Sequence, residues 1–279
     1  MSVETLDRQM EDLPPLPVVV VQALQVFNDP EFEFERLEAV VGKDQSLVSH
    51  VLKIANSPFY GLTGKVSSLK EAFIILGSNT LRNLILGVSI MRQLGDAEGT
   101  VLEQGRLWMH AYGAAMIARR LALEIPHVDE EAAFVAGLLH DIGKAFMNIC
   151  FTDDVRRIVE HAEANDCLYL DAERHLVAID HAFVGERLAR RWHLSADIAA
   201  AIGQHHDAGT QASEPLADIV HVADSLCRAL GFGYSGDDGV TPIDPAVLDR
   251  LGIDITTIER VMMDAYPQLC GARDFLQQA

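Results

Sequence analysis

Apolar residues recur along this chain at intervals of three and four residues, and no stretch alternates between apolar and polar positions long enough to indicate a sheet. This pattern predicts an all-α protein. Ser68 and Glu71 have the spacing of a capping box, which marks the start of a short helix that should end at Gly77. Together with residues that stop helices, the pattern predicts helices in the first part of the chain over about 18–27, 34–41, 45–56, 68–77 and 79–94.

The second part of the chain shows the same periodicity. Asp180 is expected to cap the first turn of a helix, which would place His181 at the start of that helix. Two more helices should contain "SADIAAAIGQHHD" and "PLADIVHVADSLCRAL", and two short helices should follow "YSGDDGVTPIDP". Before Asp180, the pattern predicts helices over about 101–123, 130–143, 153–165 and 168–178.

The segment "GDAEGT" at 95–100 is the predicted boundary between two parts of the chain. Residues 1–97 would form an N-terminal helical lobe that holds few candidate ligands. Residues 98–279 would form a second helical lobe, which carries nearly all of the histidines. The chemistry of the protein is therefore expected in the second lobe.

The net charge narrows the choice of partners. The 279 residues include 22 Lys and Arg against 41 Asp and Glu, a net charge of −19. The electrostatic field of so negative a chain repels nucleic acids and anionic membranes, so we expect neither as a partner. A bound metal ion would still attract an anionic ligand locally, because the ion is often the largest charge nearby.

Cysteine spacing and the N-terminal sequence indicate a compartment. Cys150, Cys167, Cys227 and Cys270 are far apart and show no CxxC spacing, which suits reduced thiols. The N-terminus has acidic residues where a signal peptide would be basic. The longest apolar runs, such as "VVVV" at 18–21, are far shorter than the roughly 20 residues of a membrane span. We therefore expect a soluble, cytoplasmic protein.

Histidines and aspartates gather at or near predicted helix ends, beginning with the pair His140 and Asp141 in "GLLHDIGKAF". A single histidine in such a place is more often structural than a ligand, but a group of this size favours a metal site. Two of its aspartates lie in apolar helices, where an unpaired carboxylate is costly. Mixed imidazole and carboxylate ligands suit Fe, Mn, Zn or Ni better than Ca or Mg. The candidates are His110, His140, Asp141, His181, His205, His206 and Asp224.

Several of these stretches resemble a known family. "LLHDIGK", with a histidine upstream in "LWMHAYGAA" and an aspartate downstream in "HVADSLCR", resembles the HD superfamily of metal-dependent phosphohydrolases. More narrowly, "LPPLP", "DQSLVSHVLKIANSPFYG" and "VSSLKEAFIILG" resemble the HDOD (HD-related output domain) family, and the likeness runs from residue 13 to the C-terminal region. The resemblance implies an all-α, HDOD-like multi-helix fold with an HD-domain-like core.

The resemblance also implies roles for the candidates. In the HD superfamily the matching positions bind one metal ion, which here implies His110, His140, Asp141 and Asp224. The related HD-GYP phosphodiesterases hold a second ion, and the positions that match are His181, His205 and His206, with Asp141 as the bridge. The implied cofactor is two divalent transition-metal ions, Fe or Mn in preference to Zn or Ni.

Two departures from the HD-GYP pattern limit what the resemblance implies. Arg106 stands where members with three metal ions carry a glutamate, which argues against a third ion. The stretch "DAGTQ" after the His-His pair lacks the Gly-Tyr-Pro signature, which argues against hydrolysis of cyclic di-GMP. His221, one turn before Asp224, is assigned a supporting or structural role, because the ligand set is filled without it.

Two classes of function remain open. In the first, the protein hydrolyses a phosphorylated small molecule or a nucleotide phosphodiester, with Asp141 bridging the ions and Lys144 contacting a phosphate oxygen. Lys144 has an alternative reading, a solvated lysine that compensates the end of a helix. In the second class, the protein is a non-catalytic signalling output or scaffold module, with a structural metal site or a nucleotide-sensing pocket, and it acts through a protein signalling partner.

Overall fold

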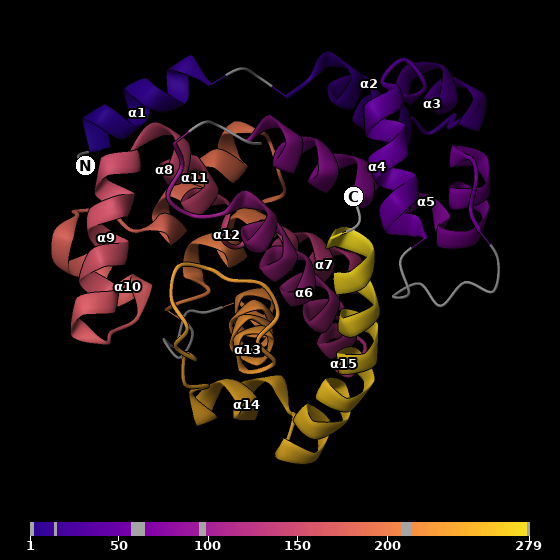
Figure 1. Cartoon of the computed structure of the whole chain (residues 1–279). Coiled ribbons are helices and arrows are strands. Elements are labelled where there is room, and N and C mark those ends of the chain that lie inside the picture. The colour runs from indigo at the N-terminus through magenta and orange to yellow at the C-terminus, as the bar shows by residue number, and fades with distance from the viewer. Residues whose placement is uncertain (1–2, 14–15, 57–64, 95–98, 208–213, 278–279) are drawn as a thin grey trace. The chain divides into compact units, whose positions relative to one another are not determined.

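A computed structural model describes residues 3–13, 16–56, 65–94, 99–207 and 214–277. Within these ranges the regular structure is α-helical and there is no strand, so the predicted all-α class is confirmed (Figure 1). The helices are α1 (Val3–Asp12), α2 (Val18–Phe27), α3 (Phe34–Val41), α4 (Gln45–Ala55), α5 (Leu69–Gln93), α6 (Gln104–Ala122), α7 (Glu130–Leu139), α8 (Ile142–Cys150), α9 (Thr152–Asn165), α10 (Tyr169–Leu176), α11 (His181–Arg191), α12 (Ala196–Gln204), α13 (Pro215–Ala229), α14 (Pro245–Leu251) and α15 (Ile255–Gln277).

The contacts between residues divide the chain into two compact units. Unit 1 comprises Met1–Leu13 and Asp96–Leu269, and unit 2 comprises Pro14–Gly95 and Cys270–Ala279. The boundary that the sequence predicts within 95–100 falls largely on residues 95–98, which lie outside the described residues. Helix α1 precedes unit 2 in the sequence and nevertheless belongs to unit 1.

Helix α1 joins unit 1 through both apolar and charged contacts. Leu6 and Met10, one turn apart, are both buried. Asp7 forms an ion pair with Arg187 of α11, and Arg191 of the same helix donates a hydrogen bond to the backbone carbonyl of Glu11. The N-terminal helix is therefore anchored on residues about 180 positions further along the chain.

Unit 2 shows how local signals set its helix ends. Asp44 caps α4 by accepting a hydrogen bond from the Leu47 amide, and Ser68 caps α5 by accepting one from the Glu71 amide at 3.1 Å. Gly77 interrupts α5 with a φ of 83° and a ψ of 170°, at the residue where the sequence predicts a break. Helix α5 packs on α4, α2 and α3.

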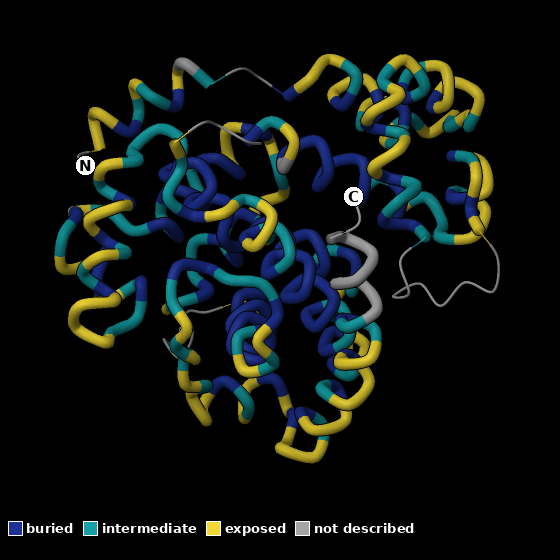
Figure 2. Tube along the Cα trace, in the orientation of Figure 1, coloured by how far each residue is buried: buried dark blue, intermediate teal, exposed yellow. Residues whose placement is uncertain are grey.

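One stretch of α5, Leu69–Ile90, has the length and apolar composition of a membrane span. More than half of its most apolar 18-residue segment is buried inside the protein, and core helices of globular proteins meet the same criteria. The bent pair Glu130–Cys150 and Thr152–Asn165 meets them too, with a bend of 115°. Helices α7, α8 and α13 are also largely buried (Figure 2).

Unit 1 is built around α6, which packs on α7 and α13, while α11 packs on α12 and α8. Small residues allow these approaches. A Cβ atom at Gly137 of α7 would lie 2.8 Å from the Ala115 Cα atom of α6. A Cβ atom at Gly143 of α8 would lie 2.0 Å from the carbonyl oxygen of His181 at the start of α11. The helices with candidate ligands are thus held close together.

Two predicted helix boundaries are wrong. The sequence predicts one helix from 130 to 143, but the structure has α7 and α8 with a break at His140 and Asp141. The His140 ring donates to the Gly137 carbonyl at 2.7 Å, and Asp141 has φ −96° and ψ 14°, outside the helical region. The last helix was expected to be short, but α15 has 23 residues and continues through Pro267.

Candidate metal centre

The helices of unit 1 bring all seven predicted ligands together, mostly from helix ends. His110 and Asp224 lie within α6 and α13, and His140 with Asp141 forms the break between α7 and α8. His181 is the first residue of α11, because Asp180 caps that helix by accepting a hydrogen bond from the Phe183 amide at 3.0 Å, as predicted. His205 and His206 follow the last residue of α12.

Three of the residues form one group, His110, His140 and Asp224, whose candidate ligand atoms all lie within 4.8 Å of one another. The Nε2 atoms of His110 and His140 are 3.3 Å apart. The Asp224 Oδ1 atom is 3.0 Å from the His110 Nε2 atom and 3.7 Å from the His140 Nε2 atom. All three side chains are buried. We call this set the first group.

The second group contains Asp141, His181, His205 and His206, and its candidate ligand atoms also lie within 4.8 Å of one another. The Nε2 atoms of His181 and His206 are 2.9 Å apart. The Asp141 Oδ1 atom is 3.2 Å from the His181 Nε2 atom and 4.0 Å from the His205 Nε2 atom. Three imidazoles thus surround one carboxylate oxygen.

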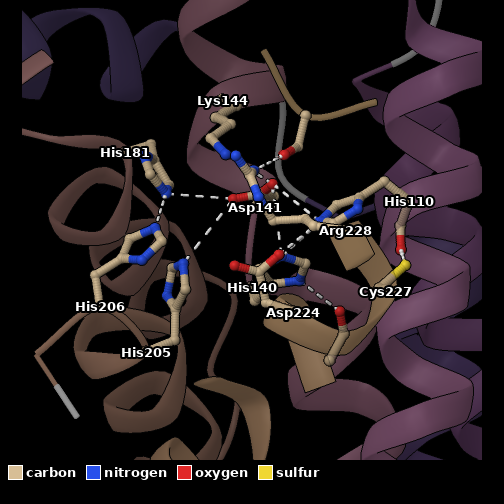
Figure 3. A network of polar contacts seen from close by, with 12 residues as sticks. His110, His140, Asp141, Lys144, His181, His205, His206, Asp224, Cys227 and Arg228 are labelled. Carbon is tan, nitrogen blue, oxygen red and sulfur yellow. Dashed lines mark hydrogen bonds and ion pairs between the residues drawn. The ribbon is translucent and has the colours of Figure 1, made fainter. Parts of the chain in front are cut away.

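Asp141, a member of the second group, also faces the first group (Figure 3). Its Oδ1 atom faces the second group, whereas its Oδ2 atom is 3.5 Å from the His140 Nε2 atom and 3.7 Å from the His110 Nε2 atom of the first. Each oxygen of a single carboxylate therefore faces a different set of nitrogen atoms. Asp141 could therefore contribute an oxygen ligand to either group.

Hydrogen bonds on the far side of the rings orient several of these histidines. The Nδ1 atoms of His140 and His205 lie 2.7 Å from the carbonyl oxygens of Gly137 and Ile202. A carbonyl only accepts, so each Nδ1 atom must carry the proton, and the Nε2 lone pair then faces the centre. His181 has a carboxylate in this place, because its Nδ1 atom lies 2.5 Å from the Oε2 atom of Glu173.

The protonation states suit cation binding. Burial, together with the charges that His140 and His181 can carry, holds the pKa of His205 well below its ordinary value. Burial and the neighbouring His205 and His181 do the same to the pKa of His206. Burial alone would raise the pKa of Asp141, but Lys144 and His140 hold it well below the usual range. At neutral pH the site therefore offers neutral imidazoles at His205 and His206 and an ionised carboxylate at Asp141.

Lys144 supplies the positive charge nearest to Asp141. Its Nζ atom is 2.9 Å from the Asp141 Oδ2 atom and 5.2 Å from the centre of the Tyr169 ring, and the residue is 2% exposed. The alternative reading of Lys144 as a solvated lysine is therefore wrong. The buried ammonium group faces the candidate metal centre instead.

The residues present fit a pair of metal ions. The His205 Nε2 atom is buried and has no hydrogen-bond partner among the described residues, although it points toward Asp141. Nitrogen atoms that would otherwise face one another at 2.9 and 3.3 Å would share a cation instead. Two groups of mixed nitrogen and oxygen donors around one carboxylate could hold divalent transition metals.

The structure also gives the positions of His221 and Arg106. The His221 Nδ1 atom lies 2.9 Å from the backbone carbonyl of His205, so His221 supports a candidate ligand, and it belongs to neither group. The Arg106 guanidinium lies 4.5 Å from the centre of the Tyr234 ring, a cation–π contact. The absence of a third metal ion stays a prediction.

Glu173 is the residue that the sequence reasoning missed. It lies on α10 on the same face as Tyr169 and Ala172, and all three are buried. The sequence feature that could have identified it is an acidic residue at an apolar position of an amphipathic helix, because a buried carboxylate requires a partner. The partner is His181, eight residues later.

Comparison with known proteins identifies a matching family and similar solved structures. Residues 13–208 match the HDOD domain. A solved HDOD domain protein of unknown function from Geobacter sulfurreducens is 26% identical, with a TM-score of 0.78 over 95% of this chain and 96% of that chain.

Two further solved structures are 22% identical and share the fold. A "Putative phosphohydrolase" from Shewanella amazonensis has a TM-score of 0.75 over 98% of both chains. A "Putative signal transduction protein" from Marinobacter aquaeolei has a TM-score of 0.76 over 98% of this chain and 65% of that chain.

The curated relatives are longer than this chain. An uncharacterised protein of Treponema pallidum is 27% identical over 240 residues, which are 85% of this chain and 45% of that protein. The chain thus spans less than half the length of the curated relatives it matches.

Proposed function

The chain belongs to the HDOD family, and on that basis we propose that it is a metal-dependent phosphohydrolase of bacterial signal transduction. Its substrate class is a phosphoester or a nucleotide phosphodiester. The observation that carries the proposal is the placement of Asp141, which presents one oxygen to each of two histidine groups. The names of the Shewanella and Marinobacter neighbours support a hydrolase and a signalling context respectively.

The metal site would hold two divalent ions, Fe or Mn in preference to Zn or Ni. The first group would hold one ion and the second group the other, with Asp141 shared between them. When bound, such ions supply Lewis acidity toward a phosphoryl oxygen and lower the pKa of water. Several neutral imidazoles and few carboxylates leave a positive site, which favours a phosphate even though the whole chain is acidic.

The side chains of the protein then perform positioning and charge neutralisation. Asp141 fixes the spacing of the two groups, and the backbone carbonyls behind His140 and His205 keep the Nε2 atoms of these rings directed inward. Lys144 places an ammonium group beside Asp141, within reach of a phosphate oxygen held in the same centre. Because these groups are fixed by packing, they need little reorganisation during the reaction.

The burial of the site favours a second candidate function. His140, His181 and His205 are each 0% exposed, which suits an ion that holds helices together as well as one that meets substrate. In this second function the protein is a non-catalytic output module or nucleotide sensor that acts through a protein partner. In both functions we place it in the cytoplasm, where its four free cysteines stay reduced.

Metal content tests the proposal directly. We expect the protein to be purified with about two equivalents of Fe, Mn or a similar metal, and the double variant His205→Ala/His206→Ala to lose at least one of them, since both rings belong to the second group. Elemental analysis measures this. His161→Ala, a histidine that stacks on His175 and belongs to neither group, serves as the control and should retain the parent content.

Activity separates the two functions. Hydrolysis of phosphodiester or nucleotide substrates that requires Asp141 and Lys144 would establish the phosphohydrolase. Metal content that falls in the double variant, combined with no hydrolysis in a broad screen, would leave the signalling module. If no metal is present and none is recovered on reconstitution, the proposal of a metal site is wrong.

A further inference from the structure

Glu173 is a carboxylate in an apolar setting. It is 0% exposed and lies on the face of α10 that also buries Tyr169 and Ala172. An isolated carboxylate in such a place is strongly unfavourable, so this residue requires a partner. The partner that the described residues provide is the His181 ring, at 2.5 Å.

The contact of Glu173 differs from those of the other oriented histidines. His140 and His205 each donate to a neutral backbone carbonyl, three residues earlier in the chain. His181 instead donates to a charged carboxylate from a different helix. The second oxygen of Glu173, Oε1, is buried and has no hydrogen-bond partner among the described residues. Among the described residues, the His181 ring is therefore the hydrogen-bond partner of Glu173.

Glu173 is also held firmly in place from the other side. The Tyr169 amide, at the start of α10, donates to Asp237 at 2.9 Å. Arg228, one turn after the candidate ligand Asp224 on α13, pairs with the same Asp237 and donates to the Gly239 carbonyl at 2.8 Å. The helix that carries Glu173 is therefore tied to a helix that carries a candidate ligand.

We propose that Glu173 is a positioning residue for the second group: it holds His181 with the Nε2 atom directed at the ion and strengthens that nitrogen as a donor. The inference rests on the proposed metal site and adds that the two groups differ in what supports their metal affinity. A carboxylate behind a metal-binding imidazole fixes its tautomer and raises its basicity. Within the described residues the first group has no such carboxylate, so Glu173 raises the affinity of the second group alone.

The test compares two substitutions at this position. Glu173→Gln keeps the size and an acceptor for the His181 proton but removes the charge, and Glu173→Leu removes both. Titration of the metal-free protein with Co²⁺, followed by visible absorption and by competition with a chelator, gives one affinity for each group. We expect Glu173→Gln to weaken one of the two binding steps about 10-fold and Glu173→Leu up to about 100-fold.

The other binding step should keep the affinity of the parent in both variants. Asp171→Asn, an exposed acidic residue on the same helix, is the matched control and should change neither step. Equal weakening of both steps would indicate a merely structural role and overturn the inference. Parent-like affinity of both steps in Glu173→Leu would overturn it as well.

A second measurement separates this inference from the proposed function. If the parent binds no Co²⁺, the metal site fails, and the role of Glu173 toward a metal fails with it. The NMR signal of the His181 ring Nδ1 proton in the metal-free protein then tells whether the contact exists. A strongly downfield signal that Glu173→Leu abolishes would confine the role of Glu173 to holding the ring, whereas an unchanged signal would exclude even that.

Discussion

Asp141 shows at the scale of one residue how a buried charge is accommodated. A carboxylate of 6% exposure would be unfavourable alone, but Lys144 and the rings of His140 and His181 surround it. Asp141 is also the N-cap residue of α8, directly after the C-cap residue of α7, so both its backbone and its side chain are constrained. Its position between the two groups follows from both constraints.

His181 makes metal binding depend on pH. Burial lowers the pKa of His181, but the charge of Glu173 together with the hydrogen bonds to Asp141 and Glu173 outweighs burial and raises that pKa to about 9. The ring is thus protonated at pH 7 in the metal-free protein, and a metal ion must displace a proton. We expect Zn²⁺ binding at pH 7 to release about one proton from this ring, and the affinity to rise about tenfold per pH unit toward pH 9.

Calorimetry in two buffers of different ionisation enthalpy measures the proton release. His205 and His206 add nothing to it, since the pKa of each lies well below its ordinary value and both rings are already neutral. His140, whose pKa is raised by Asp141 and Asp224 in spite of burial, adds to the release if it is charged. A binding enthalpy that is identical in both buffers at pH 7 would contradict the assignment of a proton to His181.

At the scale of the helix, the site depends on close approaches between elements. Asp141 directly precedes α8, Lys144 lies in its first turn, and α11 begins with His181. The two helices meet at Gly143, where a Cβ atom would lie 2.0 Å from the His181 carbonyl oxygen and 2.9 Å from the Gly185 amide nitrogen. The contacted atoms are backbone, which cannot move aside as a flexible side chain could.

Gly143→Ala should therefore push α8 away from α11. We expect a loss of about 1–3 kcal/mol in the free energy of unfolding and weaker metal binding by the second group, because overpacking forces the backbone to shift. Denaturant unfolding and Co²⁺ titration measure the two effects. Gly105→Ala in α6 is the matched control.

A Cβ atom at Gly105 would have no heavy atom within 4 Å, so that variant should be neutral or more stable by up to about 1 kcal/mol. If Gly143→Ala behaves like Gly105→Ala, the two helices do not depend on this contact.

The sequence did not predict α1, but it predicted most of the other helices because their apolar periodicity and caps are local signals. Asp180 was predicted to place His181 at a helix start, and it does so. The break at His140 and Asp141 was missed, because it depends on a side chain that bonds the backbone of its own helix. Glu173 was missed for a different reason: its partner is on another helix, and the pattern of one helix does not contain it.

At the scale of the whole molecule, the candidate metal ligands belong to one unit. All seven candidate ligands, Lys144 and Glu173 lie within Asp96–Leu269 of unit 1. Unit 2 has its own apolar core, in which Leu37, Leu47 and Val51 are each 0% exposed. The family match nevertheless includes most of both units, since it covers residues 13–208.

Core substitutions in the two units should therefore differ in their effect on metal. Leu47→Ala in α4 and Leu138→Ala in α7 both remove a buried leucine, and each should lower the free energy of unfolding by about 2–5 kcal/mol. We expect Leu47→Ala to keep the parent metal content and Leu138→Ala, two residues before His140, to lose part of it. Elemental analysis beside thermal unfolding gives both quantities, and metal loss in Leu47→Ala would show that the two units are coupled.

The membership of α1 in unit 1 has a consequence for any division of this chain. The polypeptide passes from one unit to the other three times, after residues 13, 95 and 269. If the backbone were severed between residues 95 and 98, each half-chain would keep a segment that belongs with the other, α1 in one and the end of α15 in the other. Leu6 and Met10 would then hold two separate polypeptides together, so the halves of this protein are expected to reassemble by fragment complementation.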